Sequence, residues 1–387
     1  MARANLFSRP AATSPCHPAP DAAVTDLART LAALARLVAF DTRNPPRALD
    51  GAGIFAYLRG ELAGHGLDCT TVDLGDGCVY LLAVRGAPDL LINAHLDTVP
   101  ADPAWTVDPH RLVVTGDRAI GLGACDIKGA TACLLTALAD TRGPVALLFS
   151  SDEEAGSSRC VRDFLAHHHF PRVLVAEPTR GAAVLEHRGI ATATLDFTGE
   201  GGHASAARAL HDSAVHAAVR WSARALDHAA AGQDRGDGPL RGLRLNLGTI
   251  EGGLKANMIA ASARVRLGLR PPPELPPDVA LAELAALADP ARTTFTPGFR
   301  APPLPAGGPV HLAAARASAR GLADELGLAV GEPVDFWTEA ALFSAAGATA
   351  LVFGPGDIAQ AHTAGEWVAL ADLVQVTADY RRILTRP

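Results

Sequence analysis

Short apolar runs alternate with helix-like segments along much of this chain, and several of the runs end in acidic residues or histidine. The runs are "DLLINAHLD", "GPVALLFSSDEE", "RVLVAEPT" and "ATALVFGPG". Continuous apolar runs of this length are typical of strands that are buried on both faces. Because helix-like segments separate them, the sequence predicts an α/β fold with a mixed, mostly parallel sheet flanked by helices.

The pattern changes near residue 187, where period-two alternation replaces the continuous apolar runs. Strand-like "GIATATLDFTGE", "LRLNLGTI", "NMIAASARVRLGLR" and "ARTTFTPGF" are interleaved with helical "DSAVHAAVRWSARALDHAA" and "DVALAELAALA". The order β-α-β-β-α-β is that of a ferredoxin-like module. We therefore predict a catalytic domain made of residues 25–186 and 301–387, interrupted by an inserted α+β domain at 187–300.

The start of the chain differs from both parts. Residues 1–24 are rich in proline, alanine and serine and lack the apolar centre of a signal peptide. We predict a disordered extension there, or a stretch upstream of the true start. Residues 25–66 are predicted to be helical, with the second helix beginning at the prolines of "NPPRALDG".

Composition excludes several classes of function. The chain has 387 residues, a net charge of −7 and no long basic run, so nucleic acid is not a predicted partner. Six scattered cysteines without a C-x-x-C pair are typical of a reduced, cytoplasmic protein. No stretch of 18 apolar residues is present, so no membrane span is predicted.

The chemistry is concentrated where the strands end. His95 and Asp97 are one residue apart at a strand end, so both side chains point to the same face. Acidic and imidazole groups also follow the other strands or precede a helix: Asp126, Glu153, Glu154, Glu177 and His362. In open α/β sheets, ligands bind beyond the carboxyl ends of the strands. These side chains are therefore expected to meet in one crevice.

Each of these residues has an ordinary structural explanation when it is taken alone. A histidine in a loop, a helix-capping aspartate, a solvated acidic turn and a strand-terminal glutamate are all common. Their shared position makes that set of explanations improbable, and so many carboxylates within a few ångströms would repel one another. Divalent cations resolve the conflict, and imidazole with carboxylate ligands suits zinc, cobalt or manganese better than calcium.

The motifs in sequence order resemble those of a known family of co-catalytic metallopeptidases. They are "NAHLDTVP", "GLGACDIKGA", "SSDEEAGS", "VAEPT", "GGHAS", "KANMIA" and "AHTAGEWV". The family contains acetylornithine deacetylase, succinyl-diaminopimelate desuccinylase, aminoacylase and carboxypeptidase G, and the resemblance spans residues 25–387. The stretch from "FWTEAALF" to "AHTAGEW" is most similar to the acetylornithine deacetylase branch. "DTRNPPRA" and "IEGGLKANMIA" are most similar to the N-acetyl-L-citrulline deacetylases of arginine biosynthesis.

The resemblance implies two divalent metal ions per subunit, Zn²⁺ or Co²⁺. By position, His95 and Glu177 would hold one ion and Glu154 and His362 the other. Asp126 would bridge them, with a cis peptide bond following it. Asp97 would orient His95, as second-sphere carboxylates do at many metal sites.

The same resemblance assigns the catalytic groups. Glu153 would take a proton from the attacking water and deliver it to the leaving amine. His203 in the inserted domain would stabilise the oxyanion, and in related dimers this histidine comes from the partner subunit. The inserted domain is therefore expected to serve as a lid and to form a homodimer.

The resemblance also implies substrate-binding residues, which lie in less specific motifs. Arg270 would bind the substrate carboxylate as a bidentate partner, helped by Asn257. Lys255, one of only two lysines in the chain, would repel the cation of ornithine and tolerate the neutral ureido group of citrulline. Glu339 and Gly354 would line the pocket.

The function predicted first is removal of the acetyl group from N-acetyl-L-citrulline, giving L-citrulline and acetate. Deacetylation of N-acetyl-L-ornithine is the first alternative, and a dipeptidase or desuccinylase of the same family is the second. A metal-binding scaffold without turnover is the alternative outside the enzymes. The presence of Glu153 argues against that scaffold, because it would not need a general base.

Overall fold

A six-stranded sheet forms the centre of the computed structural model, which describes residues 20–46, 48–154 and 156–386. Its strands are β1 (Asp68–Asp73), β2 (Val79–Arg85), β3 (Leu90–His95), β6 (Val145–Ser150), β7 (Arg172–Val175) and β14 (Thr349–Val352). They lie in the order β1-β2-β6-β3-β7-β14. β6, β3, β7 and β14 pair in parallel, whereas β2 is antiparallel to both neighbours. The predicted mixed, mostly parallel sheet is confirmed.

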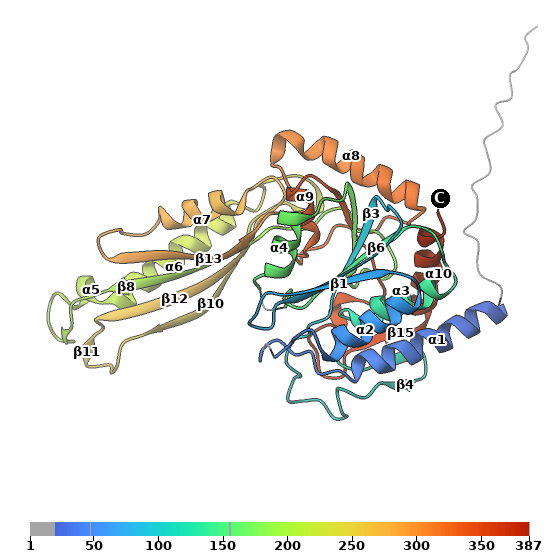
Figure 1. Cartoon of the computed structure of the whole chain (residues 1–387). Coiled ribbons are helices and arrows are strands. Elements are labelled where there is room, and N and C mark those ends of the chain that lie inside the picture. Colours follow the sequence, from blue (N-terminus) through green and yellow to red (C-terminus); the bar gives the residue numbers. More distant parts are fainter. Residues whose placement is uncertain (1–19, 47, 155, 387) are drawn as a thin grey trace, which may run out of the picture.

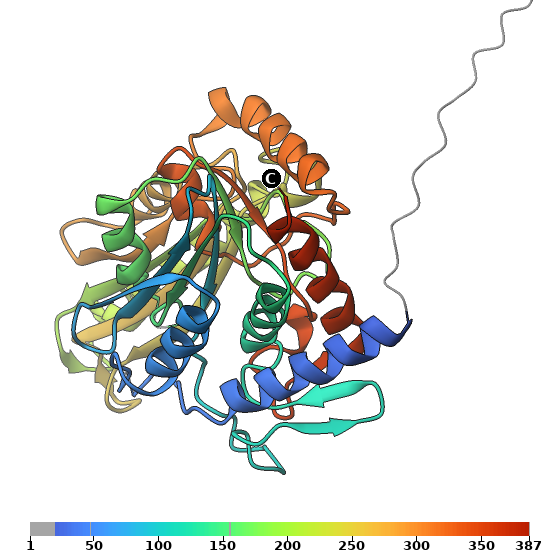
Figure 2. The ribbon, with the colours of Figure 1, turned by 45° about the vertical axis from the view of Figure 1, so that its right-hand side comes forward.

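Helices cover both faces of this sheet (Figures 1 and 2). One layer contains α1 (Pro20–Val38), α2 (Gly53–Gly64), α3 (Lys128–Ala139), α8 (Pro309–Leu326) and α10 (Leu370–Leu384), and the other contains α4 (Arg159–His167) and α9 (Ala340–Ala345). In β6, Leu147 and Phe149 pack on the first layer and Ala146 and Leu148 on the second. Burial on both faces explains why β6 reads as a continuous apolar run.

A small three-stranded sheet lies beside the main one. It consists of β4 (Val113–Thr115), β5 (Arg118–Ile120) and β15 (Trp367–Ala369), in the order β15-β5-β4. β15 pairs antiparallel with β5, and the Arg118 guanidinium lies 4.0 Å from the centre of the Trp367 ring. This sheet joins the C-terminal part of the chain to the loop that precedes α3.

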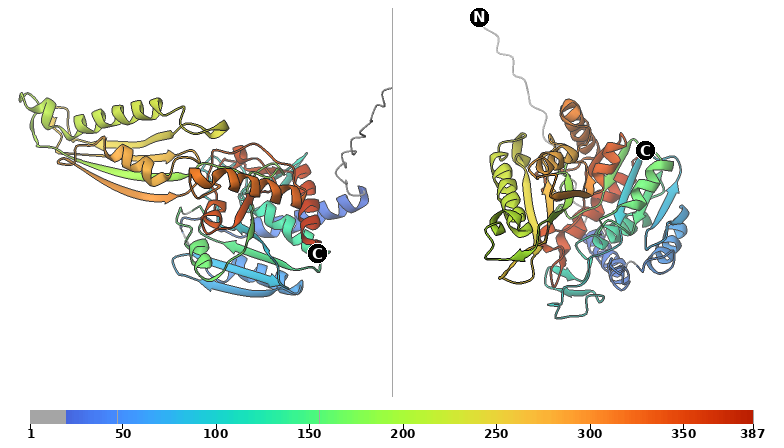
Figure 3. Two further views of the ribbon diagram at one scale, coloured as in Figure 1. Left: turned by 90° about the horizontal axis from the view of Figure 1, so that it is seen from above. Right: turned by 90° about the vertical axis from the view of Figure 1, so that its left-hand side faces the viewer.

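The inserted segment forms its own antiparallel sheet, in the order β10-β12-β8-β13. The strands are β8 (Ile190–Thr198), β10 (Arg244–Gly252), β12 (Ser262–Arg270) and β13 (Thr293–Ala301), and α6 (Ala214–Ala231) and α7 (Pro277–Ala285) cover one face. Short elements complete it: β9 (Gly202–His203), α5 (Ala209–Asp212), η1 (Gly238–Leu240) and β11 (Met258–Ile259). The order β-α-β-β-α-β is as predicted. This sheet extends away from the six-stranded sheet (Figures 1 and 3).

Two expectations near the start of the chain need comment. The predicted disordered extension, residues 1–24, lies outside the described residues except for 20–24, which form the first turn of α1. The second helix was expected to begin at the prolines, but α2 begins at Gly53. Pro45 and Pro46 would fit the first turn of a helix but do not require one, and they lie in a turn at 44–46 instead. Among the described residues, no helix is both long and apolar enough to cross a membrane.

Candidate metal centre

Four parallel strands carry the candidate ligands to one edge of the main sheet. His95 is the last residue of β3, Glu154 follows β6, and Glu177 follows β7. Beyond β14, the loop that contains η2 (Ile358–Gln360) brings His362, and Asp126 lies just before α3. The carboxyl ends of parallel strands share an edge, so ligands that are distant in the sequence become neighbours.

A first group consists of His95, Asp126 and Glu177, all of them buried. One ligand atom from each lies within 4.8 Å of the others. Nε2 of His95 lies 3.1 Å from Oδ1 of Asp126 and 3.9 Å from Oε1 of Glu177. The three side chains therefore converge on a point that one cation can occupy.

A second group shares Asp126 with the first and adds Glu154 and His362. Nε2 of His362 lies 2.8 Å from Oε1 of Glu154 and 3.5 Å from Oδ2 of Asp126. The two oxygens of Asp126 thus face different histidines. That is the arrangement a bridging carboxylate needs in a two-metal site. The peptide bond between Asp126 and Ile127 is cis, as the resemblance implied.

Asp97 ties the first group to the turn after β6. Nδ1 of His95 lies 3.0 Å from the backbone oxygen of Asp97 and 3.5 Å from its carboxylate, so the Nδ1 hydrogen has an acceptor and Nε2 is left to face a cation. The carboxylate of Asp97 also accepts the backbone N–H groups of Glu153 and Glu154. One buried aspartate therefore orients a ligand histidine and fixes the acidic turn.

The carboxylates at the centre carry excess negative charge. Burial raises the pKa values of Glu153 and Glu177 well above their ordinary range, and neighbouring carboxylates raise them further. Burial also raises the pKa of Glu339 to about 8. A divalent cation that binds among buried carboxylates offsets their mutual repulsion and so lowers the free energy of the folded protein.

The same carboxylates raise the pKa values of both ligand histidines. Hydrogen bonds to Asp126 and Glu154 raise the pKa of His362 to about 10. For Asp126, burial acts to raise the pKa, but hydrogen bonds to His362 and His95 outweigh it and the pKa is lowered. A site of imidazole and carboxylate donors fits divalent transition metals, and no thiol from the described cysteines joins either group.

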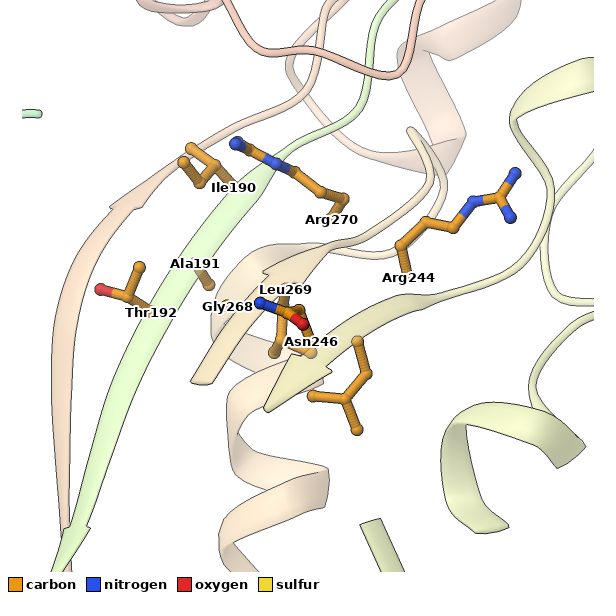
Figure 4. A pocket seen from close by; sticks show the side chains of 9 residues that line it. Ile190, Ala191, Thr192, Arg244, Asn246, Gly268, Leu269 and Arg270 are labelled. Carbon is orange, nitrogen blue, oxygen red and sulfur yellow. The ribbon is translucent and has the colours of Figure 1, made fainter. Parts of the chain in front are cut away.

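Arg270 lies at the end of β12, where the inserted sheet meets the main body. It lines a pocket of about 240 Å³ together with Ile190, Thr192, Arg244 and Asn246, among other residues (Figure 4). The guanidinium groups of Arg270 and Arg244 point in different directions in this pocket. Nη1 of Arg270 is buried and has no hydrogen-bond partner among the described residues. Burial lowers the pKa of Arg270, and the charge of Glu153 opposes that shift, which links the arginine to the metal centre.

Three predicted residues lie far from these groups. His203, Lys255 and Asn257 are exposed and belong to, or adjoin, the two-stranded β9–β11 sheet, where His203 pairs with Met258. Figure 1 shows β11 at the end of the inserted sheet that is distant from the six-stranded sheet. One chain therefore does not bring them to its own metal centre.

The two remaining predicted residues lie close to it. Glu339 is buried before α9, and Ser150 donates a hydrogen bond of 3.2 Å to its Oε2. Its Oε1 is buried without a partner among the described residues. Gly354 packs on the backbone of a ligand, because a Cβ there would lie 2.7 Å from the oxygen of Glu177.

Sequence reasoning missed two residues that support the centre. Asn44 donates hydrogen bonds to Asp97 and to the backbone oxygen of Ser151, at 3.3 and 3.1 Å. Glu366 accepts backbone N–H groups from the loop that carries Asp126. Both lie inside quoted motifs, "TRNPP" and "AHTAGEWV", but only the structure shows what they contact.

Comparison with known proteins identifies the family. The model of peptidase family M20/M25/M40 matches residues 91–386, which is more than half of the chain. The chain belongs to this family. It is therefore a metal-dependent hydrolase, as the resemblance implied, and the two ligand groups described above are its candidate metal sites.

Two relatives resemble the chain over most of its length. N-acetyl-L-citrulline deacetylase from Xanthomonas campestris pv. campestris is 52% identical over 364 residues, which cover 93% of this chain and 99% of that protein. Acetylornithine deacetylase from Myxococcus xanthus is 34% identical over 375 residues, covering 90% and 94%.

Solved structures of the family share the fold at low sequence identity. Aminopeptidase PepT from Bacillus cereus has a TM-score of 0.71 at 15% identity and covers 93% of this chain and 99% of that one. The M20 family metallo-carboxypeptidase Sso-CP2 from Sulfolobus solfataricus has a TM-score of 0.69 at 16% identity, covering 92% and 98%. These likenesses support the fold and carry no information about the substrate.

Proposed function

We propose that this enzyme hydrolyses N-acetyl-L-citrulline to L-citrulline and acetate, a step of arginine biosynthesis. The observation that carries the proposal is the 52% identity to a deacetylase of this substrate over nearly the full length of both chains. The clustered ligands and Glu153 supply the groups that such a hydrolysis needs. A cytoplasmic location is part of this proposal, in keeping with the free thiols of Cys69, Cys125, Cys133 and Cys160.

The chemistry assigns separate roles to the residues of the centre. Two divalent ions, Zn²⁺ or Co²⁺, held by His95, Glu177, Glu154, His362 and the bridging Asp126, would supply Lewis acidity to the amide carbonyl and to a nearby water. Glu153 is outside both ligand groups and takes the proton of the attacking water. Its raised pKa suits a group that then returns this proton to the leaving amine.

The substrate contacts follow from the charges around the centre. Arg270 binds the α-carboxylate, because its buried Nη1 has no partner among the described residues and its guanidinium lines a pocket at the end of β12. In this proposal Glu339 and Gly354 line the pocket from the same chain, and Asn257 and Lys255, which lie beside His203 at the far end of the inserted sheet (Figure 1), reach it from the partner subunit. His203 stabilises the developing oxyanion, and the enzyme acts as a homodimer in which this histidine comes from the partner subunit.

The first experiment is a comparison of N-acetyl-L-citrulline and N-acetyl-L-ornithine as substrates of the same preparation, with and without added Co²⁺ or Zn²⁺. We expect metal-dependent turnover with a clear preference for the citrulline compound. A preference for the ornithine compound would assign the second candidate, which the 34% identity to an acetylornithine deacetylase supports. If neither substrate is hydrolysed even with added metal, both assignments are rejected, and dipeptides and succinylated amino acids are tested next.

A further inference from the structure

Glu366 is a buried carboxylate whose partners are backbone N–H groups. The residue is 2% exposed. Its Oε2 accepts the N–H of Gly123 at 2.9 Å, and its Oε1 accepts the N–H groups of Cys125 and Asp126, both at 2.9 Å. Charge-assisted bonds of this kind compensate for the cost of burying a carboxylate. With both oxygens engaged in this way, Glu366 is not arranged as a metal ligand.

These N–H groups belong to the loop that presents the bridging ligand. α3 begins at Lys128, and no side chain caps its N-terminus. Backbone donors before a helix need acceptors, and a distant carboxylate supplies them here. Since the N–H of Asp126 itself is one of the three, the position of Asp126 depends directly on Glu366.

The same residue also closes the turn that follows His362. The N–H of Glu366 donates to the oxygen of Thr363 at 3.2 Å, and its own backbone oxygen accepts the N–H of Gly121 at 3.0 Å. Pairing of β15 with β5 continues this connection along the chain. The loop that carries His362 and the loop that carries Asp126 are thus joined through one side chain and the backbone next to it.

We propose that Glu366 is a positioning residue that holds Asp126 and His362 in the relative placement required to bind two divalent ions. The inference rests on the proposed metal centre and adds a residue that contacts neither substrate nor metal. Because Asp126 belongs to both ligand groups, loss of Glu366 weakens both sites. Shifts of a fraction of an ångström in a ligand are sufficient for such an effect.

The test compares Glu366→Gln and Glu366→Ala with the full-length protein. Gln keeps the size and one acceptor but turns an NH₂ group toward a backbone N–H, and Ala removes both acceptors. Zn²⁺ and Co²⁺ affinities are measured by titration calorimetry after chelation, with the rise in Tm on metal addition as a second reading. We expect affinity to fall about tenfold for Gln and up to about a hundredfold for Ala.

Asp26→Asn is the matched control. Asp26 is also a buried carboxylate, 7% exposed, and its partner is Arg381 at 2.6 and 2.8 Å rather than the metal loops. This variant should lower the Tm of the metal-free protein and leave metal affinity unchanged.

The proposal is overturned if Glu366→Gln lowers only the Tm of the metal-free protein while its metal affinity stays at the wild-type value. It is also overturned if the wild-type protein takes up no metal. Normal metal binding without turnover of N-acetyl-L-citrulline would instead reject the proposed function and leave the role of Glu366 intact.

Discussion

Glu153 and its neighbour Glu154 occupy consecutive positions with different environments. Glu154 contacts His362 at 2.8 Å and belongs to a ligand group, whereas Glu153 belongs to neither group. We predict that Glu153→Gln lowers kcat by about 10²–10⁴-fold, the usual contribution of a general acid–base, with metal content unchanged. Steady-state kinetics together with metal analysis of the dialysed protein test this. A variant with near-normal kcat would assign the proton transfer to another group.

Substitution of Lys255 tests whether this residue makes the enzyme prefer a substrate with a neutral side chain over one with a cationic side chain. The residue is exposed on the segment that leads into β11, so its charge can be reversed without disturbing the core. We predict that Lys255→Asp shifts the ratio of kcat/KM values toward N-acetyl-L-ornithine by at least tenfold, because repulsion of the cation becomes attraction. The exposed Arg320 on α8 provides the control, Arg320→Asp, which should not change the ratio. An unchanged ratio in Lys255→Asp would remove this residue from the basis of selectivity.

Among single residues, the sequence predicts those whose own side chains are candidate metal ligands. Strand-end positions indicated that His95, Asp126 and Glu177 would meet, and the structure places them together. Asn44 and Glu366 were missed because their effect passes through Asp97 and through backbone N–H groups. A local pattern does not show which distant loop will present those groups.

Among the elements, the start of β8 is where the inserted sheet is attached to the main body. His187 lies there, fully buried, and exchanges backbone hydrogen bonds with Leu304 on the returning segment. Its ring lies 2.8 Å from the oxygen of Arg188 and 3.1 Å from Oγ1 of Thr338. Thr338 precedes Glu339, so His187 joins both connecting segments to the edge of the metal centre.

This buried histidine makes stability depend on pH. Burial, with a smaller contribution from the charge of Arg270, lowers the pKa of His187 from an ordinary value of 6.5 to about 4, although hydrogen bonds oppose this shift. The unfolded chain therefore binds the proton first, and the contribution to stability is complete above pH 6.5 and is lost as the pH falls toward 4. The loss amounts to roughly 3 kcal/mol in the free energy of unfolding.

Urea unfolding of the wild type and of His187→Gln at pH 7 and at pH 4.5 measures this pH-dependent contribution to the free energy of unfolding. We predict that the fall in unfolding free energy between the two pH values is about 2–3 kcal/mol smaller in the variant, because glutamine does not titrate. The exposed His216→Gln should retain the wild-type fall. Equal falls in wild type and His187→Gln would show that His187 is not held neutral in the folded protein.

Element types were predictable where a segment repeats its pattern over many residues. The alternation in β8 and β12 indicated one buried face, and their burial alternates accordingly. The three-residue strands β4, β5 and β15 have no such repeat, and pairing between β5 and β15 depends on residues more than 240 positions apart. The start of α2 was misplaced because a proline favours the first turn of a helix but does not require one.

In the whole molecule, His203 lies far from the metal centre of its own chain. The inserted sheet extends away from the main body, and His203 lies in the small β9–β11 sheet at its distant end (Figures 1 and 3). Exposed apolar side chains lie on the same segment, including Leu210, Ile250 and Leu254. A second copy that packs against this region by two-fold symmetry would bury them and could place each His203 at the other copy's metal centre.

Subunit mixing tests that arrangement. His203→Ala and Glu153→Gln should each be nearly inactive alone, because every site in either homodimer lacks one group. When equal amounts are dissociated and reassembled together, half of the dimers combine the two chains, and each mixed dimer contains one site with both groups intact. We predict recovery of about a quarter of the wild-type activity, as random pairing in a two-fold dimer requires. Activity that stays at the sum of the two separate variants would mean that His203 does not act across the dimer, and the oxyanion would then need a donor from the chain that binds the metals.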